Sequence, residues 1–62
     1  MPKINNIPTY AKEYKWIVAR LEDSEYWFWG AWNDEKKALE IADKLENAAV
    51  YENMDFKEII SG

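Results

Sequence analysis

The residue types that could do chemistry in this 62-residue chain are aromatic side chains and arginine, and the chemistry that they offer is binding. The run Tyr26–Trp32 places five aromatic residues within seven positions, and three of them are tryptophans. Such residues dominate protein–protein contacts because they bury a large area at a low cost in rotamer freedom and still make polar contacts. The candidate partner-binding residues are Trp16, Val18, Arg20, Trp27 and Trp29.

Catalytic and metal-binding arrangements are missing from the sequence. The chain has no histidine and no cysteine, and its only serine or threonine hydroxyls are those of Thr9, Ser24 and Ser61. No phosphate-binding loop, dinucleotide-binding glycine pattern, EF-hand or zinc-ligand spacing occurs. The carboxylate pair Glu22 and Glu25 flanks a turn, where acids usually serve solubility. We therefore expect no enzyme activity, no cofactor, no metal site and no small-molecule substrate.

Charge and hydropathy restrict the class of partner and the compartment. The net charge is −4, and the acids are concentrated after residue 21, which argues against general affinity for nucleic-acid phosphates. No apolar run reaches the length of a signal-peptide core or the roughly 20 residues of a membrane span. The absence of cysteine suits a reducing compartment. We expect a cytoplasmic protein that binds neither membrane nor nucleic acid.

Two strands and a tight turn are predicted around the aromatic run. Residues 14–21 and 26–32 are rich in aromatic and β-branched residues, and Asp23-Ser24 between them predicts a two-residue turn. Pairing Glu22 with Glu25 places three pairs on one face, namely Leu21 with Tyr26, Ala19 with Phe28, and Ile17 with Gly30. The other face then carries Arg20 beside Trp27, Val18 beside Trp29, and Trp16 beside Ala31. A three-residue loop would instead bury Trp27 and Trp29 with Ile17, Ala19 and Leu21.

One amphipathic helix is predicted over residues 34–46. Asn33 is a suitable N-cap, Asp34 and Glu35 favour the first turn, and Asn47 can end the helix in a left-handed conformation. One apolar stripe is formed by Ala38, Ile41, Ala42 and Leu45. We expect this helix to cover the face that carries Leu21, Ala19 and Phe28, because aliphatic and small residues suit a packed helix. The face with the candidate binding residues would then stay uncovered.

The predicted fold is a small α+β domain. Residues 48–52 form a third strand, which gives a three-stranded antiparallel sheet in the order 2-1-3, with one helix on one face and the aromatic strand at an edge. Residues 1–12 contain two prolines and read as an irregular N-terminal arm, and residues 13–62 as a single ββαβ domain. A short C-terminal helical turn is expected around Phe56, Ile59 and Ile60.

A non-catalytic protein-binding module of the adaptor or inhibitor type is the function that these features favour. An uncovered aromatic face needs a partner, and in size and charge the chain is similar to phage and mobile-element products that block host proteins. A homodimer through this face or through the aromatic edge strand is one alternative. Another is that the face is a second small core, covered by the arm or by the C-terminal residues; the covering side chains would be Ile4, Ile7 and Tyr10 or Phe56, Ile59 and Ile60. A third is single-stranded nucleic-acid binding, in which Trp16, Trp27 and Trp29 stack on bases while Lys15 and Arg20 meet phosphates.

Overall fold

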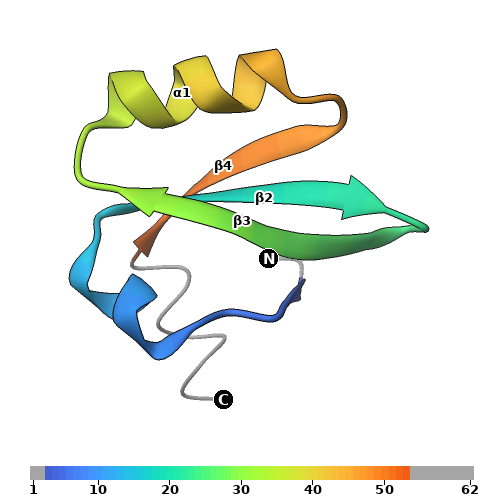
Figure 1. Cartoon of the computed structure of the whole chain (residues 1–62), viewed down its shortest axis with the longest axis horizontal. Helices are drawn as coiled ribbons and strands as arrows, with labels where there is room; N and C mark the ends of the chain where they lie inside the picture. The colour runs from blue at the N-terminus through green and yellow to red at the C-terminus, as the bar shows by residue number, and fades with distance from the viewer. Residues whose placement is uncertain (1–2, 54–62) are drawn as a thin grey trace.

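The computed structural model describes residues 3–53, which form a four-stranded sheet with one α-helix on one face and the N-terminal arm on the other (Figure 1). The α+β class predicted from the sequence is confirmed. The elements in chain order are β1 (Ile4–Asn5), the 3₁₀-helix η1 (Thr9–Glu13), β2 (Trp16–Glu22), β3 (Glu25–Trp32), α1 (Glu35–Lys44) and β4 (Ala48–Glu52).

The sheet is mixed and has the strand order β1-β3-β2-β4. Strand β2 is antiparallel to both β3 and β4, whereas β1 runs parallel to β3, with Ile4 opposite Tyr26 and Asn5 opposite Trp27. The prediction of a three-stranded antiparallel sheet in the order 2-1-3 is therefore wrong, because the arm contributes a fourth, parallel strand. A two-residue strand is too short to produce an alternating pattern in the sequence. The structure identifies it by its pairing with β3 and by the burial of Ile4.

The β2–β3 hairpin closes through the predicted two-residue turn. Asp23 and Ser24 both have positive φ angles, of 51° and 67°, as a type I′ turn requires. Glu22 pairs with Glu25, Leu21 with Tyr26, and Ala19 with Phe28, as predicted. The alternative register with a three-residue loop is excluded by these pairs.

Helix α1 begins at Glu35, one residue later than predicted. Asp34 is the N-cap, and its side chain accepts a hydrogen bond from the Lys36 N–H at 3.0 Å. The predicted N-cap, Asn33, instead accepts from the Lys15 N–H at 3.2 Å and so ties the start of β2 to the end of β3. The helix ends at Lys44, two residues before the predicted end, and its C-cap is Leu45 in an extended conformation. Asn47 has a left-handed conformation, with a φ of 57°, but the prediction that it ends the helix is wrong.

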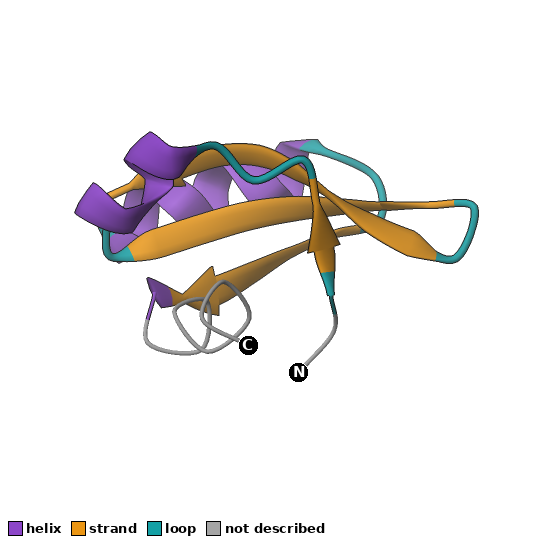
Figure 2. Cartoon of the chain, turned by 90° about the horizontal axis from the view of Figure 1, so that it is seen from below, coloured by secondary structure: helices purple, strands orange, loops and turns teal. Residues whose placement is uncertain are grey.

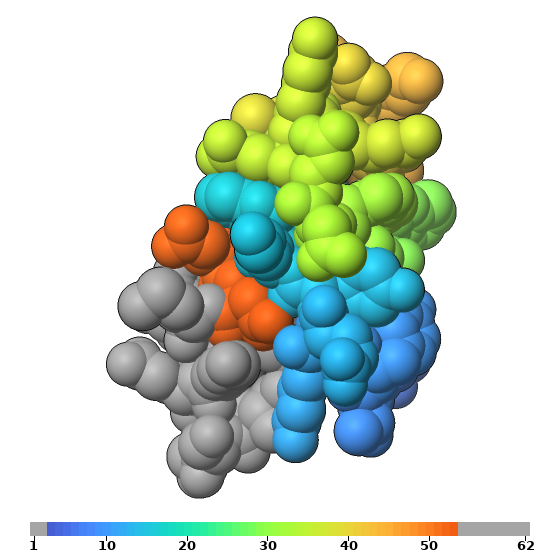
Figure 3. Space-filling view, turned by 90° about the vertical axis from the view of Figure 1, so that its left-hand side faces the viewer, coloured from blue at the N-terminus to red at the C-terminus, as the bar shows by residue number. Residues whose placement is uncertain are grey.

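The arm covers one face of the sheet and builds the main core there. Ile4 and Ala11 from the arm are buried together with Ile17 and Ala19 of β2. Figure 2 shows the sheet from the side of the arm, and in Figure 3 the arm, the strands and the helix follow one another as layers. The half-buried residues packed against this core are Ile7, Tyr26, Phe28, Ala31 and Tyr51.

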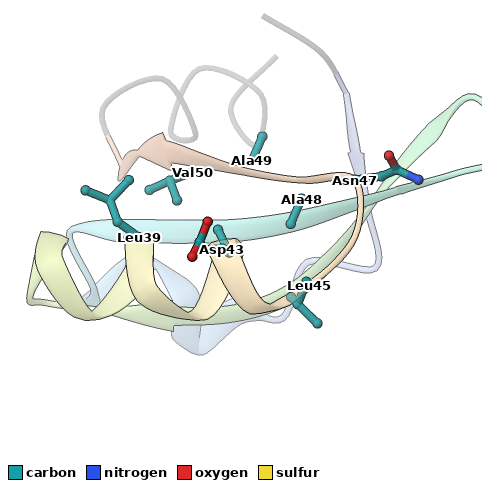
Figure 4. Close-up of a pocket in the computed structure, with 8 residues that line it drawn as sticks. Leu39, Asp43, Leu45, Asn47, Ala48, Ala49 and Val50 are labelled. Carbon is teal, nitrogen blue, oxygen red and sulfur yellow. The ribbon is translucent and has the colours of Figure 1, made fainter.

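Helix α1 covers the opposite face, so its predicted placement on the Leu21, Ala19 and Phe28 face is wrong. Val50 lies opposite the fully buried Val18, and Val50 and Ala48 point toward the helix (Figure 4). Strands β3 and β4 are parallel and α1 connects them across β2. Such a connection is almost invariably right-handed. Its handedness therefore determines which face of the sheet the helix covers, regardless of which face is more aliphatic.

Tyr51 makes the stability of the core depend on pH at alkaline values. Its ring packs edge-to-face on Tyr26 at a centroid distance of 5.8 Å. Burial, followed by a hydrogen bond with Tyr26, raises the pKa of Tyr51 from 10.0 to about 12. Because the folded-state pKa is the higher one, this stabilisation is complete below pH 10 and is lost as the pH rises to about 12. Urea unfolding at several alkaline pH values measures this effect. The free energy of unfolding should fall less steeply with rising pH for Tyr51→Phe than for the wild type.

Two sequence predictions concern the C-terminal part and the membrane. The predicted helical turn at Phe56, Ile59 and Ile60 lies outside the described residues. Within residues 3–53, no helix has the length and the apolar character needed to cross a lipid bilayer.

Candidate functional site

The five candidate partner-binding residues lie on the sheet face that carries α1, and the helix covers part of them. Val18 is completely buried, Trp16 is half-buried and Arg20 is exposed. Trp27 and Trp29 keep 39% and 50% of their surface exposed. The expectation of a fully uncovered face with all five residues is therefore wrong, and Val18 is core rather than surface.

A β-bulge at Trp29 rearranges the pairs at the far end of the hairpin. Ala19 pairs with Phe28 but Val18 pairs with Gly30, so Trp29 is the additional residue of β3. The predicted neighbours Val18 and Trp29, and the two pairs predicted beyond them, are wrong for this reason. The observed pairs there are Val18 with Gly30, Ile17 with Ala31, and Trp16 with Trp32. A bulge bends its strand and redirects the side chain of the additional residue, which here is the most exposed of the four tryptophans.

Arg20, Trp27 and Trp29 form what we call the tryptophan patch. Arg20 lies directly opposite Trp27, so both side chains are on one face, and Trp29 follows Trp27 by two residues along β3, at the bulge. Figure 1 shows that the hairpin extends beyond the end of α1 where β2 and β3 approach their turn. This extension leaves Arg20 exposed although its strand is central in the sheet. The patch is thus an apolar surface with one cation at its side.

Gly30 is required where it stands because the Trp32 indole lies over it. A Cβ atom at position 30 would lie 2.5 Å from Cη2 and 2.8 Å from Cζ3 of Trp32. The backbone of Gly30 does not have a positive φ, so only this contact opposes a larger residue. We expect Gly30→Ala to destabilise the fold by about 1–3 kcal/mol through displacement of the ring.

The control for this prediction is the same change in a Trp32→Ala background. Without the indole, Gly30→Ala should be neutral or stabilising, since glycine inside a strand costs about 0.5–1 kcal/mol relative to alanine. Urea unfolding of the wild type, the two single variants and the double variant gives the coupling free energy between positions 30 and 32. Equal effects of Gly30→Ala in both backgrounds would contradict the packing argument.

A groove with both apolar and polar lining lies between α1 and β4 (Figure 4). Its volume is about 440 Å³. Leu39 is 51% exposed at its helical wall, and Asp43 of the same wall adds a carboxylate. The lining residues are Leu39, Ala42, Asp43, Leu45, Asn47, Ala48, Ala49 and Val50. Sequence reasoning did not find this groove, although Leu39 could have signalled it, because it falls outside the apolar stripe that explains the other helix residues.

No group of three or more carboxylates, the ligand type that this chain could offer a metal ion, gathers anywhere between residues 3 and 53. The polar features of the described structure are instead anchors of the backbone. Asn53 is one of them, since its Nδ2 donates to the Lys12 carbonyl at 3.0 Å and its N–H to the Lys15 carbonyl at 2.8 Å. These bonds tie the end of β4 to the arm and to the start of β2.

Neither a protein-family model, nor a curated protein, nor a solved structure matches this chain.

Proposed function

We propose that the chain is a non-catalytic protein-binding module, of the adaptor or inhibitor type, that engages another protein through the tryptophan patch. The observation that carries the proposal is the exposure of two nearby tryptophans, 39% for Trp27 and 50% for Trp29. A chain this small has few apolar residues to spare for its surface, because a domain of about 60 residues buries only about 60% of its extended surface. Leaving two tryptophans outside the core therefore calls for a partner.

The composition of the patch fits a protein partner better than nucleic acid. Arg20 beside Trp27 gives the residue pair that is most typical of interface hot spots, where an aromatic ring fills a pocket and a guanidinium makes directed hydrogen bonds. Stacking of bases on Trp27 and Trp29 would need a cationic path for the phosphates. The net charge of −4 opposes such a path.

The compartment belongs to the same proposal. The domain is built without any cysteine, so its stability comes from packing rather than from disulfides. We propose that it acts in the cytoplasm, where disulfides are rare.

Affinity capture with a patch variant tests the proposal. The tagged wild type and the tagged Trp29→Ala variant are compared with Glu40→Ala, which truncates an exposed side chain of the helix outside the patch and outside the α1–β4 groove. We expect a partner to be retained by the wild type and by Glu40→Ala and to be lost with Trp29→Ala, since truncating a hot-spot residue costs 2 kcal/mol or more, about thirtyfold in affinity. Circular dichroism of each variant checks that the fold persists.

Three results would contradict the proposal. Retention of the partner by Trp29→Ala would place the contact elsewhere. A steep loss of binding with rising salt, together with nuclease sensitivity, would identify the partner as nucleic acid. A concentration-dependent dimer in sedimentation that Trp29→Ala abolishes would mean that the patch joins two copies of this chain.

A further inference from the structure

Strand β4 has an unpaired outer edge within the described part of the chain. It is the last strand in the sheet order, and its inner edge pairs with β2. Asn47 accepts from the Leu21 N–H at 2.6 Å, and the Asn53 N–H donates to Lys15 at 2.8 Å. In an antiparallel pair every second residue bonds to the partner strand, so the odd-numbered residues of β4 face β2. The backbone N–H and C=O groups of Ala48, Val50 and Glu52 therefore point outward.

The same outward edge borders the groove under α1. Side chains of Val50 and Ala48 point toward the helix, where Leu39 and Ala42 form the other wall (Figure 4). A strand added to β4 would place every second side chain on this face, beside Leu39. Backbone pairing and a groove whose walls carry the apolar side chains of Leu39, Ala42, Ala48 and Val50 are thus offered at one place, which is the arrangement that proteins use for strand addition.

One acidic residue lines this groove and two more lie on the same sides of its walls, of which Glu52 has Lys15 beside it. Asp43 lines it, Glu35 lies on the same flank of the helix because it precedes Leu39 by one turn, and Glu52 follows Val50 by two on the same face of β4. Lys36 is the one cation on this flank of the helix, at its first turn. A second copy pairing edge to edge would bring these acids against the same acids, and like charges oppose such a pair. A basic segment instead finds opposite charges at both ends of the groove.

We propose that the outer edge of β4 and the α1–β4 groove form a second docking site, distinct from the tryptophan patch and independent of the proposed function. The occupant is an extended segment of another protein that pairs with Ala48, Val50 and Glu52. Its groove-facing side chains are apolar at the centre, beside Leu39, and lysine or arginine toward the ends, beside Asp43 and Glu52.

The test uses the whole chain, labelled with nitrogen-15, and the peptide acetyl-Lys-Thr-Val-Thr-Val-Thr-Lys-amide. This sequence reads the same in both directions, so it presents valines and lysines on one face whether it binds parallel or antiparallel. We expect the NMR chemical shifts of the amides of Ala48, Val50 and Glu52 to change and to saturate below about 1 mM peptide. Hydrogen exchange at the same amides should slow down. The same peptide with glutamate in place of lysine should bind at least about tenfold more weakly.

Charge reversal on the groove wall supplies the matched control. Asp43→Lys should reduce the preference for the lysine peptide, because Glu35 and Glu52 remain at the other end of the groove, whereas Glu40→Lys, at an exposed position outside the groove lining, should leave the preference unchanged. The variant Trp29→Ala should bind the basic peptide as the wild type does, which separates this site from the tryptophan patch. These are the results that support the proposal.

Several results would overturn it. One is the absence of saturable shifts, and another is equal binding of both peptides by the wild type. A third is that the shifts fall on the indole groups of Trp27 and Trp29 instead of on β4. Protection of the Ala48 and Val50 amides that grows with protein concentration, without peptide, would mean that a second copy occupies the edge.

Discussion

Replacing Ile17 by alanine is expected to leave a large fraction of the chain unfolded at room temperature. Ile17 is completely buried in the central strand, between Ile4 and Ala11 of the arm and Ala19 of its own strand. Truncation of a buried isoleucine to alanine costs about 2–5 kcal/mol, while a core of this size rarely supplies more than about 3–5 kcal/mol in total. Thermal unfolding followed by circular dichroism should show a transition lowered by at least about 10 °C.

Leu39→Ala is the matched control for Ile17→Ala. Both changes remove the same number of carbon atoms, but the Leu39 side chain is 51% exposed and belongs to the groove wall. We expect this variant to lose less than about 1 kcal/mol, because little apolar surface returns to water and no closed cavity forms. Equal destabilisation of the two variants would contradict the assignment of Ile17 to the core and of Leu39 to the surface.

The local parts of the fold could be predicted from the sequence because each is decided by neighbouring residues. The Asp23-Ser24 turn and the pairing of Glu22 with Glu25 follow from turn chemistry within a few positions. The helix was predicted from the spacing of its apolar stripe, and the structure has it from Glu35 to Lys44. Such features need no knowledge of distant contacts.

The two faces of the sheet could not be assigned from composition. Both faces carry apolar residues that need cover, since Val18 is as fully buried under α1 as Ile17 is under the arm. The connection from β3 through α1 to β4 decides the side of the helix by its hand, and the arm takes the side that remains. The bulge at Trp29 could not be predicted from the sequence either, because the β-propensity of an aromatic run does not indicate which residue is left unpaired.

The candidate site was predicted only in part, because some of its residues depend on long-range features of the fold. Arg20 and Trp27 lie within the part of the hairpin whose register follows from the turn, and they form an exposed pair. Val18 lies beyond the bulge and under the helix, so its predicted exposure depended on two long-range features at once. Whether Trp16, Arg20, Trp27 and Trp29 contact a partner stays a prediction for the capture experiment.

Removing the arm is expected to unfold the rest of the chain. The arm supplies Ile4, which is 4% exposed, and Ala11, which is completely buried, to the core on the face of Ile17. Without residues 1–13 this face would return to water, and each large apolar side chain that is exposed costs about 1.5–3 kcal/mol. Since a core of this size rarely supplies more than about 3–5 kcal/mol in total, residues 14–62 alone should show no cooperative thermal transition.

A point variant separates packing by the arm from the length of the chain. Ile4→Ala keeps every residue of the arm and should still cost about 2–5 kcal/mol, because Ile4 is buried against β3 where β1 pairs with Tyr26. Thr9→Ala, at an exposed position of the same arm, should change stability by less than about 0.5 kcal/mol. A shortened chain that unfolds cooperatively near the wild-type temperature would mean that residues 14–62 fold without the arm. In that case the aromatic residues Tyr26, Phe28 and Tyr51 would form an exposed surface on the face opposite α1, which is larger than the tryptophan patch and would compete with it for partners.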